Sequence, residues 1–213
     1  MPATVELKVL TGMPSLGNNE TRDVCGGCNG GCCRTMPGGW HPKQWKGVAE
    51  GDFTGVIQAL VAGLASIDWW DGDELYHADP HTRRRTYAKL EKRGYFLRPA
   101  IKPGKRRGAP LFGFDAPPDG DGGVFDPTYG GECTWFRDGK GCELEFADRP
   151  LNCQALVANP DNPGRTRNPD AVGCSAPQEM SKSGIILAWQ PYSEQLERAG
   201  RQAEEELRKR RQR

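Results

Sequence analysis

Four cysteines within a short glycine-rich segment constrain this chain more than any other feature of its sequence. The segment reads Cys25-Gly-Gly-Cys28-Asn-Gly-Gly-Cys32-Cys33, so only glycine and asparagine separate the thiols. Glycine adopts positive φ and allows close backbone approach, which a chain that folds tightly around an ion requires. Backbone N–H groups in such a turn can also point at thiolate or sulfide sulfur. The segment therefore predicts a metal-binding loop.

The remaining four of the eight cysteines are spread widely over the second half of the chain. They are Cys133, Cys142, Cys153 and Cys174. The fold has to gather them, and two groups of four thiols match two Cys₄ sites, or one cluster with a second site or spare thiols. We expect all eight to be metal ligands. The alternative of a buried thiol that acts as a small hydrophobe fits only one or two of them, because the first group has no apolar neighbours.

The ligand types favour sulfur coordination but leave the metal open. All-thiolate sites suit both zinc and iron–sulfur clusters. The three histidines, His41, His77 and His81, lie outside both cysteine groups, which disfavours mixed Cys/His zinc sites and Rieske centres. Because adjacent Cys32 and Cys33 cannot easily face one tetrahedral ion, we prefer an iron–sulfur cluster such as [4Fe–4S] and keep zinc as the alternative.

Composition narrows the class of protein. The chain has 213 residues, a net charge of +1, and 36% apolar and 27% charged residues. These values exclude collagen, a coiled coil, a membrane protein or a disordered tail as a description of the whole chain. The near-neutral charge is unlike that of a uniformly basic nucleic-acid binder. The 28 glycines and 17 prolines predict many loops.

The expected compartment bears on the state of the thiols. The N-terminal residues MPATVELKVL lack the basic start, apolar run and small-residue cleavage site of a secretory signal. The most apolar stretch, residues 56–67, is much shorter than the about 20 residues that a membrane span needs. We therefore expect a cytoplasmic protein with no membrane segment, in which thiols stay reduced. A disulfide framework is the alternative.

The cysteine pattern resembles a known family. The loop Cys25–Cys33, the pair Cys133 and Cys142, the motif Arg149-Pro150-Leu151-Asn152-Cys153 and the later Cys174 follow the order found in the CxxCxxCC, or YkgJ-like, family. That family is described as zinc- or iron-chelating. The resemblance covers the first loop and the stretch from residue 131 to residue 174, and it implies bound metal. Some relatives are linked to protein methylation, but no cofactor motif for that reaction occurs in this chain.

The motif before Cys153 also has a physical interpretation. Pro150 fixes the backbone shortly before the expected ligand. Arg149 could offset the negative charge of a thiolate cluster. The alternative is an ordinary turn with a surface arginine.

Periodicity predicts a mixed set of elements. We expect three helices: a core helix that Asp52 caps and that runs to Ile67, a basic helix at Thr82–Arg93 and a charged helix at Ser193–Arg213. Strands are expected at Thr4–Leu10 and Leu111–Phe114, and an apolar run lies at Ile185–Trp189. An aromatic and acidic turn is expected at Asp68–Asp73, and loops at Lys102–Gly108, Ala116–Gly123 and Asn159–Asp170. The expected fold class is a small, loop-rich, metal-organised α+β domain over residues 1–192, followed by the charged helix 193–213. Residues 34–132 form a helical insertion between the cysteine loop 25–33 and the second cysteine region 133–174.

The charged helix carries its own pattern. Glutamates precede basic residues by four positions at Glu194/Arg198, Glu197/Arg201, Glu204/Arg208, Glu205/Lys209 and Glu206/Arg210. Each such pair favours an isolated helix by about 0.2–0.5 kcal/mol. The apolar stripe, which consists of Leu196, Ala199, Ala203 and Leu207, could dock on a partner, although a solvated helix is the alternative.

Two further segments are weaker candidates for sites. Residues 68–74, with His77, Asp79 and His81, could supply oxygen and nitrogen ligands to a hard metal, or could be an aromatic anchor with exposed acids. Basic clusters at residues 83–85, 102–107 and 208–213 could contact nucleic acid, but their balancing acids favour solvated faces.

The sequence therefore predicts a metal-binding protein that acts as a structural or interaction module with a protein partner. A redox or protein-modifying iron–sulfur enzyme is the alternative, and a zinc-dependent nucleic-acid-binding protein is a second alternative.

Overall fold

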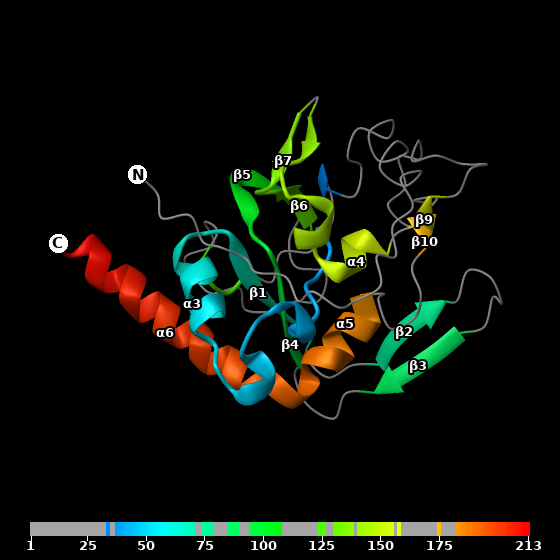
Figure 1. Cartoon of the computed structure of the whole chain (residues 1–213), viewed down its shortest axis with the longest axis horizontal. Helices are drawn as coiled ribbons and strands as arrows, with labels where there is room; N and C mark the ends of the chain where they lie inside the picture. The colour runs from blue at the N-terminus through cyan, green and yellow to red at the C-terminus, as the bar shows by residue number, and fades with distance from the viewer. Residues whose placement is uncertain are drawn as a thin grey trace.

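The structure is a computed structural model that combines helices with small antiparallel strand pairs, so the α+β prediction is confirmed at that level (Figure 1). It describes residues 33–34, 37–70, 74–78, 85–89, 94–107, 123–126, 130–138, 140–155, 157–158, 174–175 and 182–213.

The described residues form both helices and strands. The helices are η1 Pro42–Gln44, η2 Val48–Glu50, α3 Thr54–Val61, η3 Phe146–Asp148, α4 Leu151–Gln154, α5 Lys182–Trp189, η6 Gln190–Tyr192 and α6 Ser193–Arg211. The strands are β1 Ala65–Trp70, β2 Glu74–Ala78, β3 Arg85–Lys89, β4 Gly94–Pro99, β5 Ile101–Arg107, β6 Gly130–Cys133, β7 Phe136–Arg137, β8 Gly141–Cys142, β9 Val157–Ala158 and β10 Cys174–Ser175. The pairs are β1–β4, β2–β3, β5–β6, β7–β8 and β9–β10.

The β1–β4 pair forms the centre of the hydrophobic core. Ile67 lies opposite Leu97 in the antiparallel register, and both side chains are fully buried. The segment 124–126 adds a parallel bridge beside β1, because the Ile67 N–H donates to the Val124 carbonyl at 2.7 Å and the Asp126 N–H donates to the Ile67 carbonyl at 2.8 Å. Strands buried on both faces read as continuous apolar runs rather than as alternating patterns.

The core helix is shorter than the sequence predicts. The N-cap residue is Phe53 and not Asp52, although the Asp52 carboxylate, one residue earlier, accepts a hydrogen bond from the Thr54 N–H at 2.9 Å. The helix ends at Val61, however, and Gly63 follows with a φ of +68°. Glycine adopts this left-handed conformation at no steric cost and commonly ends helices. The expected extension to Ile67 is wrong, because Ile67 belongs to β1.

The predicted C-terminal helix is confirmed and lies against the core. It packs on α3 and β4 (Figure 1). Leu196, Ala199 and Ala203 are buried, so most of its apolar stripe is covered within this chain. Gly200 makes the approach possible, since a Cβ on it would lie 2.4 Å from Phe125 Cζ and 2.8 Å from Ile67 Cδ1.

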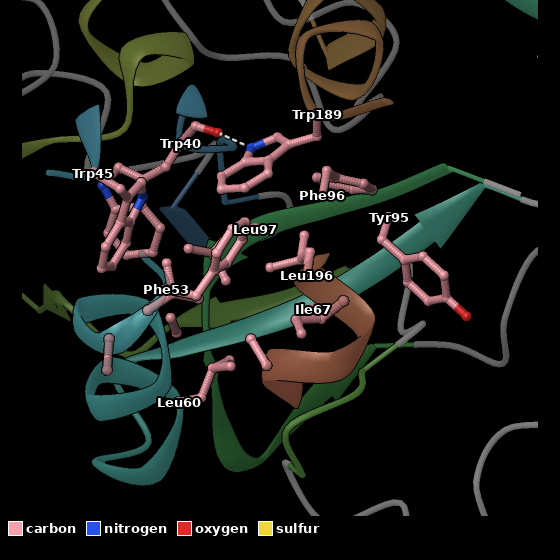
Figure 2. Packing of buried hydrophobic residues seen from close by; sticks show 14 of the residues in the cluster. Trp40, Trp45, Phe53, Leu60, Ile67, Tyr95, Phe96, Leu97, Trp189 and Leu196 are labelled. Carbon is pink, nitrogen blue, oxygen red and sulfur yellow. Dashed lines mark hydrogen bonds between the residues drawn. The ribbon is translucent and has the colours of Figure 1, made fainter. Parts of the chain in front are cut away.

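The apolar run before this helix is helical as well. Ile185, Ile186 and Trp189 of α5 are fully buried, and α5 packs on β4. Trp189 donates its indole N–H to the Trp40 carbonyl at 2.6 Å (Figure 2). The Trp40 N–H in turn donates to the Leu97 carbonyl at 2.9 Å. The segment that follows the first cysteine loop is therefore fixed to the central strand pair.

Three further predictions of secondary structure are wrong. Residues 85–89 form β3, which pairs with β2, where a basic helix is expected over 82–93. Residues 101–107 form β5 where a loop is expected, with an irregular register against β6. Asp68, Trp69 and Trp70 lie in β1 and not in a turn. In each case pairing with another strand decides the structure and overrides local propensity, and for β1 and β5 that partner lies more than 20 residues away along the chain.

Several expectations lie outside the described residues. They concern the strand at 4–10, residues 111–114, most of 116–123 and the loop at 159–170. Within the described part of the chain, none of the helices has the length and apolar character that crossing a membrane requires.

Candidate metal centre

Cys133 and Cys142 lie on two adjoining hairpins. Cys133 ends β6, is buried, and stands opposite Ile101 of β5. Cys142 lies in β8 opposite Phe136 and packs partly against the core. Gly141 has a φ of +83°, which suits the tight turn between β7 and β8.

The β7–β8 hairpin is anchored to the central strands. The Trp135 indole N–H donates to the Leu64 carbonyl at 3.3 Å, and the Thr134 N–H donates to the Ala100 carbonyl at 2.8 Å. The Phe136 side chain is almost fully buried. The two cysteines of this region therefore have positions that the core determines.

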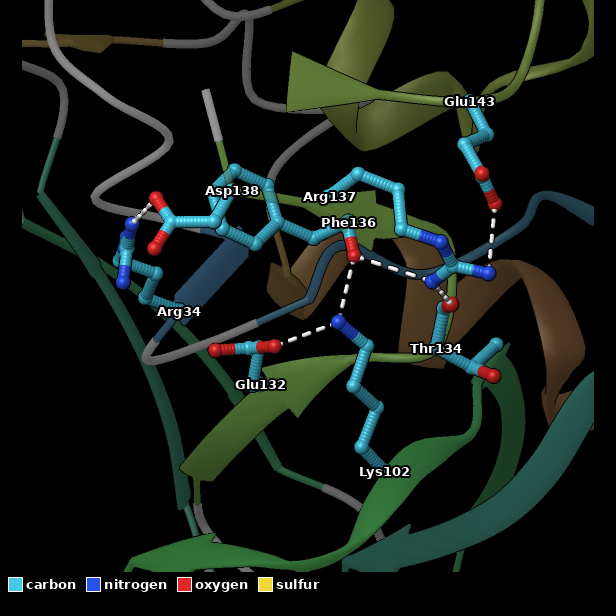
Figure 3. A network of polar contacts seen from close by, with 8 residues as sticks. All are labelled: Arg34, Lys102, Glu132, Thr134, Phe136, Arg137, Asp138 and Glu143. Atoms are coloured by element: carbon cyan, nitrogen blue, oxygen red, sulfur yellow. Dashed lines mark hydrogen bonds and ion pairs between the residues drawn. The ribbon is translucent and has the colours of Figure 1, made fainter. Parts of the chain in front are cut away.

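Arg34 connects the end of the first cysteine loop to this hairpin (Figure 3). Its guanidinium forms an ion pair with Asp138 and lies 4.8 Å from the centre of the Phe136 ring. Cys33 immediately precedes Arg34 and is partly buried. Because consecutive Cα atoms are about 3.8 Å apart, the backbone of Cys33 is separated from the hairpin that contains Cys142 by one such step and the length of the Arg34 side chain.

Lys102 completes the polar network. Its ammonium donates to Glu132 Oε1 and to the Phe136 carbonyl, each at 2.5 Å (Figure 3). This hydrogen bond from Lys102 lowers the pKa of Glu132. On the other side of the hairpin, Arg137 pairs with Glu143 at 2.8 Å. The network balances positive and negative charge.

Cys153 lies in the single turn of α4. Its N–H donates to the Pro150 carbonyl at 2.7 Å, and Pro150 is the N-cap residue of this turn. Arg149 donates through Nε to the Leu144 carbonyl at 3.2 Å, and its guanidinium lies 5.7 Å from the Phe146 ring. The expected role of Arg149 beside a thiolate cluster stays a prediction.

The structure describes only part of the predicted ligand set. Cys25, Cys28 and Cys32 lie outside the described residues, and only the backbone of Cys174 is described, in β10 opposite Ala158. Among the cysteines with described side chains, which are Cys33, Cys133, Cys142 and Cys153, no disulfide forms. Within this part of the chain, no three His, Cys, Asp or Glu side chains gather as a metal site would require.

The donors that are described nevertheless suit a soft metal. Thiolates select zinc and iron–sulfur clusters over hard cations. In addition, the Cys153 sulfur lies against the backbone of Gly38, in a space that a Cβ at that position would fill. Thiol chemistry and this close backbone approach are both compatible with a thiolate centre.

In the second candidate site, Asp68 is the one acid whose side chain is described, and its role differs from the expected one. Asp68 is buried and pairs with Arg98, with Oδ2 and Nε 3.5 Å apart. Arg98 also faces Asp126, at 3.6 Å, and donates to its backbone carbonyl at 2.8 Å. Asp68 is therefore neither an exposed turn residue nor part of a described metal site. His77 lies in β2, while Asp79 and His81 fall outside the described residues.

Sequence reasoning missed the residues that organise the region. Arg34, Asp138, Gly38 and Gln44, whose Nε2 donates to the Arg149 carbonyl at 2.9 Å, carry no motif of their own. Only the position of Arg34 directly after the cysteine loop could have drawn attention to it. Comparison with known proteins gives no family, since no family model, curated protein or solved structure matches the chain.

Proposed function

We propose that this chain is a metal-binding protein whose cysteines hold an iron–sulfur cluster or zinc, and that it acts as a structural or interaction module. One observation carries the proposal. Arg34 follows Cys33 and pairs with Asp138, 104 positions away, which supports a close approach between the first cysteine loop and the hairpin that contains Cys142. The proposed ligands are Cys25, Cys28, Cys32, Cys33, Cys133, Cys142, Cys153 and Cys174.

The physical role that we propose for such a metal is to stabilise the fold. A metal bound by several thiolates supplies folding energy, because no preformed site exists in the unfolded chain. The residues of this chain contribute by holding the thiols in place, with β6 and β8 anchored to the core and α4 turned by Pro150. We prefer the cluster over zinc because adjacent Cys32 and Cys33 suit one tetrahedral ion poorly.

The surroundings of the protein form part of the same proposal. Thiols that serve as ligands require a reducing compartment, so we place the protein in the cytoplasm. A structural module implies a protein partner, and we propose that such a partner exists. We assign no surface of this chain to it. Resemblance to the YkgJ-like family, stated above from the cysteine motifs, supports the metal and not a particular partner.

Metal analysis of protein purified without oxygen tests the proposal. We expect iron and acid-labile sulfide in equal amounts, with the broad visible absorption of a cluster. A colourless protein with zinc would support the site and overturn the preference for iron. Protein without either metal would contradict the proposal.

The same preparation separates the alternatives. Reversible reduction of a bound cluster would favour the redox or protein-modifying enzyme over the structural module. Binding of nucleic acid that weakens steeply with salt would instead favour the nucleic-acid-binding alternative.

A further inference from the structure

The Cys153 sulfur occupies the space beside Gly38 that a side chain at that position would fill. A Cβ built on Gly38 would lie 2.6 Å from Cys153 Sγ, 2.8 Å from Asn152 Oδ1 and 3.2 Å from the Cys153 backbone nitrogen. Gly38 is buried, and it is absent from the described glycines with positive φ. The requirement for glycine here is therefore space for the sulfur, and it is not backbone conformation.

The same segment holds the turn that carries Cys153. Gln44 is buried, and its Oε1 accepts hydrogen bonds from the Leu151 N–H at 2.7 Å and the His41 N–H at 3.0 Å. Its Nε2 donates to the Arg149 carbonyl at 2.9 Å. Gln44 therefore binds the backbone on both sides of Pro150, three residues before the sulfur.

This segment is itself fixed to the core. Trp40 lies between Gly38 and Gln44 and is hydrogen-bonded to both β4 and α5, through the Leu97 carbonyl and the Trp189 indole. Asp148, next to the same turn, accepts a hydrogen bond at its carbonyl from the Trp40 indole N–H at 3.4 Å. The backbone against which the Cys153 sulfur rests is thus connected to the fully buried residues Leu97 and Trp189.

We infer that Gly38 and Gln44 are positioning residues that set the place of the Cys153 sulfur for metal binding. The inference rests on the proposed function. Metal–thiolate bonds have a narrow range of length, so a displaced sulfur loses affinity. Residues that orient a ligand without touching the metal typically change affinity about 10- to 100-fold when they are replaced.

Two adjacent glycines provide a matched test. Gly38→Ala places a methyl group on the Cys153 sulfur. Gly39→Ala places one against Ile185 Cγ2, at 2.8 Å, with Leu97 and Ile185 as its neighbours. Both variants crowd a buried site next to Trp40, but only the first displaces the ligand. Each protein is stripped of metal, reloaded with zinc as the probe, and titrated with a competing chelator, while urea unfolding of the metal-free form measures stability.

We expect Gly38→Ala to weaken zinc affinity about 10- to 100-fold and Gly39→Ala to leave it nearly unchanged at a comparable loss of stability. A second readout is the alkylation rate of Cys153 in the metal-free protein, followed by peptide mass. The alkylation rate should differ from that of the original protein in Gly38→Ala and equal it in Gly39→Ala. A general loss of stability would not produce this difference between the two variants.

A further variant covers the case in which Gly38→Ala does not fold. Gln44→Glu keeps the acceptor for Leu151 and removes the donor to Arg149, and we expect it to lower zinc affinity as well. Equal zinc affinity in the original protein, Gly38→Ala and Gln44→Glu, or an equal loss in Gly39→Ala, would overturn the inference alone. Failure of the original protein to bind zinc or iron would overturn the proposed function and the inference with it.

Discussion

Arg34 and Asp138 form an ion pair that joins the residue after Cys33 to the turn of the β7–β8 hairpin. The same guanidinium covers the Phe136 ring, which lies opposite Cys142 in the hairpin. This contact brings together two parts of the chain that are far apart in sequence. The cysteine pattern alone shows only that each part contains four cysteines. The Arg34–Asp138 ion pair thus links the end of the first cysteine group to the hairpin that contains Cys142.

The ion pair gives a first prediction. Replacing Asp138 by Asn should weaken zinc binding of the reloaded protein, because the end of the cysteine loop loses its attachment. The cost in stability should be only about 0–1 kcal/mol, since the Asp138 side chain is 80% exposed. Chelator competition and urea unfolding measure the two effects.

Glu143→Gln is the matched control. Glu143 pairs with Arg137 on the same hairpin, at 2.8 Å, whereas the residue that Arg34 pairs with is Asp138. Its replacement should cost a similar amount of stability and leave zinc affinity unchanged. Equal zinc affinities for Asp138→Asn and the original protein would show that the ion pair does not organise the site.

Buried charge gives a second prediction. Arg98 is the cation between the buried carboxylates of Asp68 and Asp126. Arg98→Met should destabilise the fold by about 3–5 kcal/mol, because it leaves buried carboxylates without their counter-charge. Urea unfolding at neutral pH measures the loss.

Arg201 offers the exposed counterpart of this arrangement. It also lies between two carboxylates, those of Glu197 and Glu204, but its side chain is 64% exposed. Arg201→Met should therefore cost about 1 kcal/mol or less. Similar losses in Arg98→Met and Arg201→Met would contradict the account of the core.

Helix packing gives a third prediction. Gly200→Ala should destabilise the protein by about 1–3 kcal/mol, because the methyl group would overlap Phe125 and Ile67. Gly55→Ala in α3 should instead be neutral or stabilising by up to about 1 kcal/mol, since its Cβ would meet only Trp45 Cε3 at 4.0 Å. Thermal unfolding of the two variants checks the opposite signs, and a stabilising Gly200→Ala would contradict the packing of α6.

Features that depend on local sequence pattern could be predicted, whereas features that depend on tertiary contacts could not. The helix 193–211 has strong propensity, Glu-first ion pairs and one apolar stripe, and it forms as expected, with Lys209 and Glu205 at 2.7 Å. The helix that begins at Thr54 is also foreseen, but not its end at Val61. There the periodic apolar residues continue past Gly63, and only pairing with β4 shows that Ile67 belongs to a strand.

The same distinction between local pattern and tertiary contacts applies to the candidate site. The cysteine types and spacing indicate thiol chemistry, because ligand identity is local information. The importance of Gly38 and Gln44 could not be predicted, since it depends on Cys153 and Leu151, more than a hundred residues later. Likewise, the role of Asp68 depends on Arg98, its partner across the β1–β4 pair.

His41 gives a fourth prediction, for pH dependence. Burial, with a smaller effect from Lys43, lowers the pKa of His41, and its Nδ1 accepts a hydrogen bond from the Lys43 N–H at 3.1 Å. The unfolded chain then binds a proton more readily than the folded chain. The contribution of His41 to stability is therefore complete above its unfolded pKa of about 6.5 and is lost as pH falls from there through the folded pKa.

His41→Asn tests this prediction, because asparagine can cap the helix η1 but does not titrate. Histidine becomes charged between about pH 7 and about pH 5. Over this range, the urea midpoint of the original protein should fall more than that of the variant. Parallel pH profiles for the two proteins would show that His41 does not carry this dependence.

Native mass spectrometry of protein prepared without oxygen tests the central claim most directly. The measurement compares the original chain with Cys28→Ser from the first cysteine group and Cys142→Ser from the second. We predict that the original protein carries the added mass of an iron–sulfur cluster or of zinc, and that each substitution removes bound metal. An original protein with the mass of the polypeptide alone, or metal that survives both substitutions, would contradict the claim that the two cysteine groups hold metal.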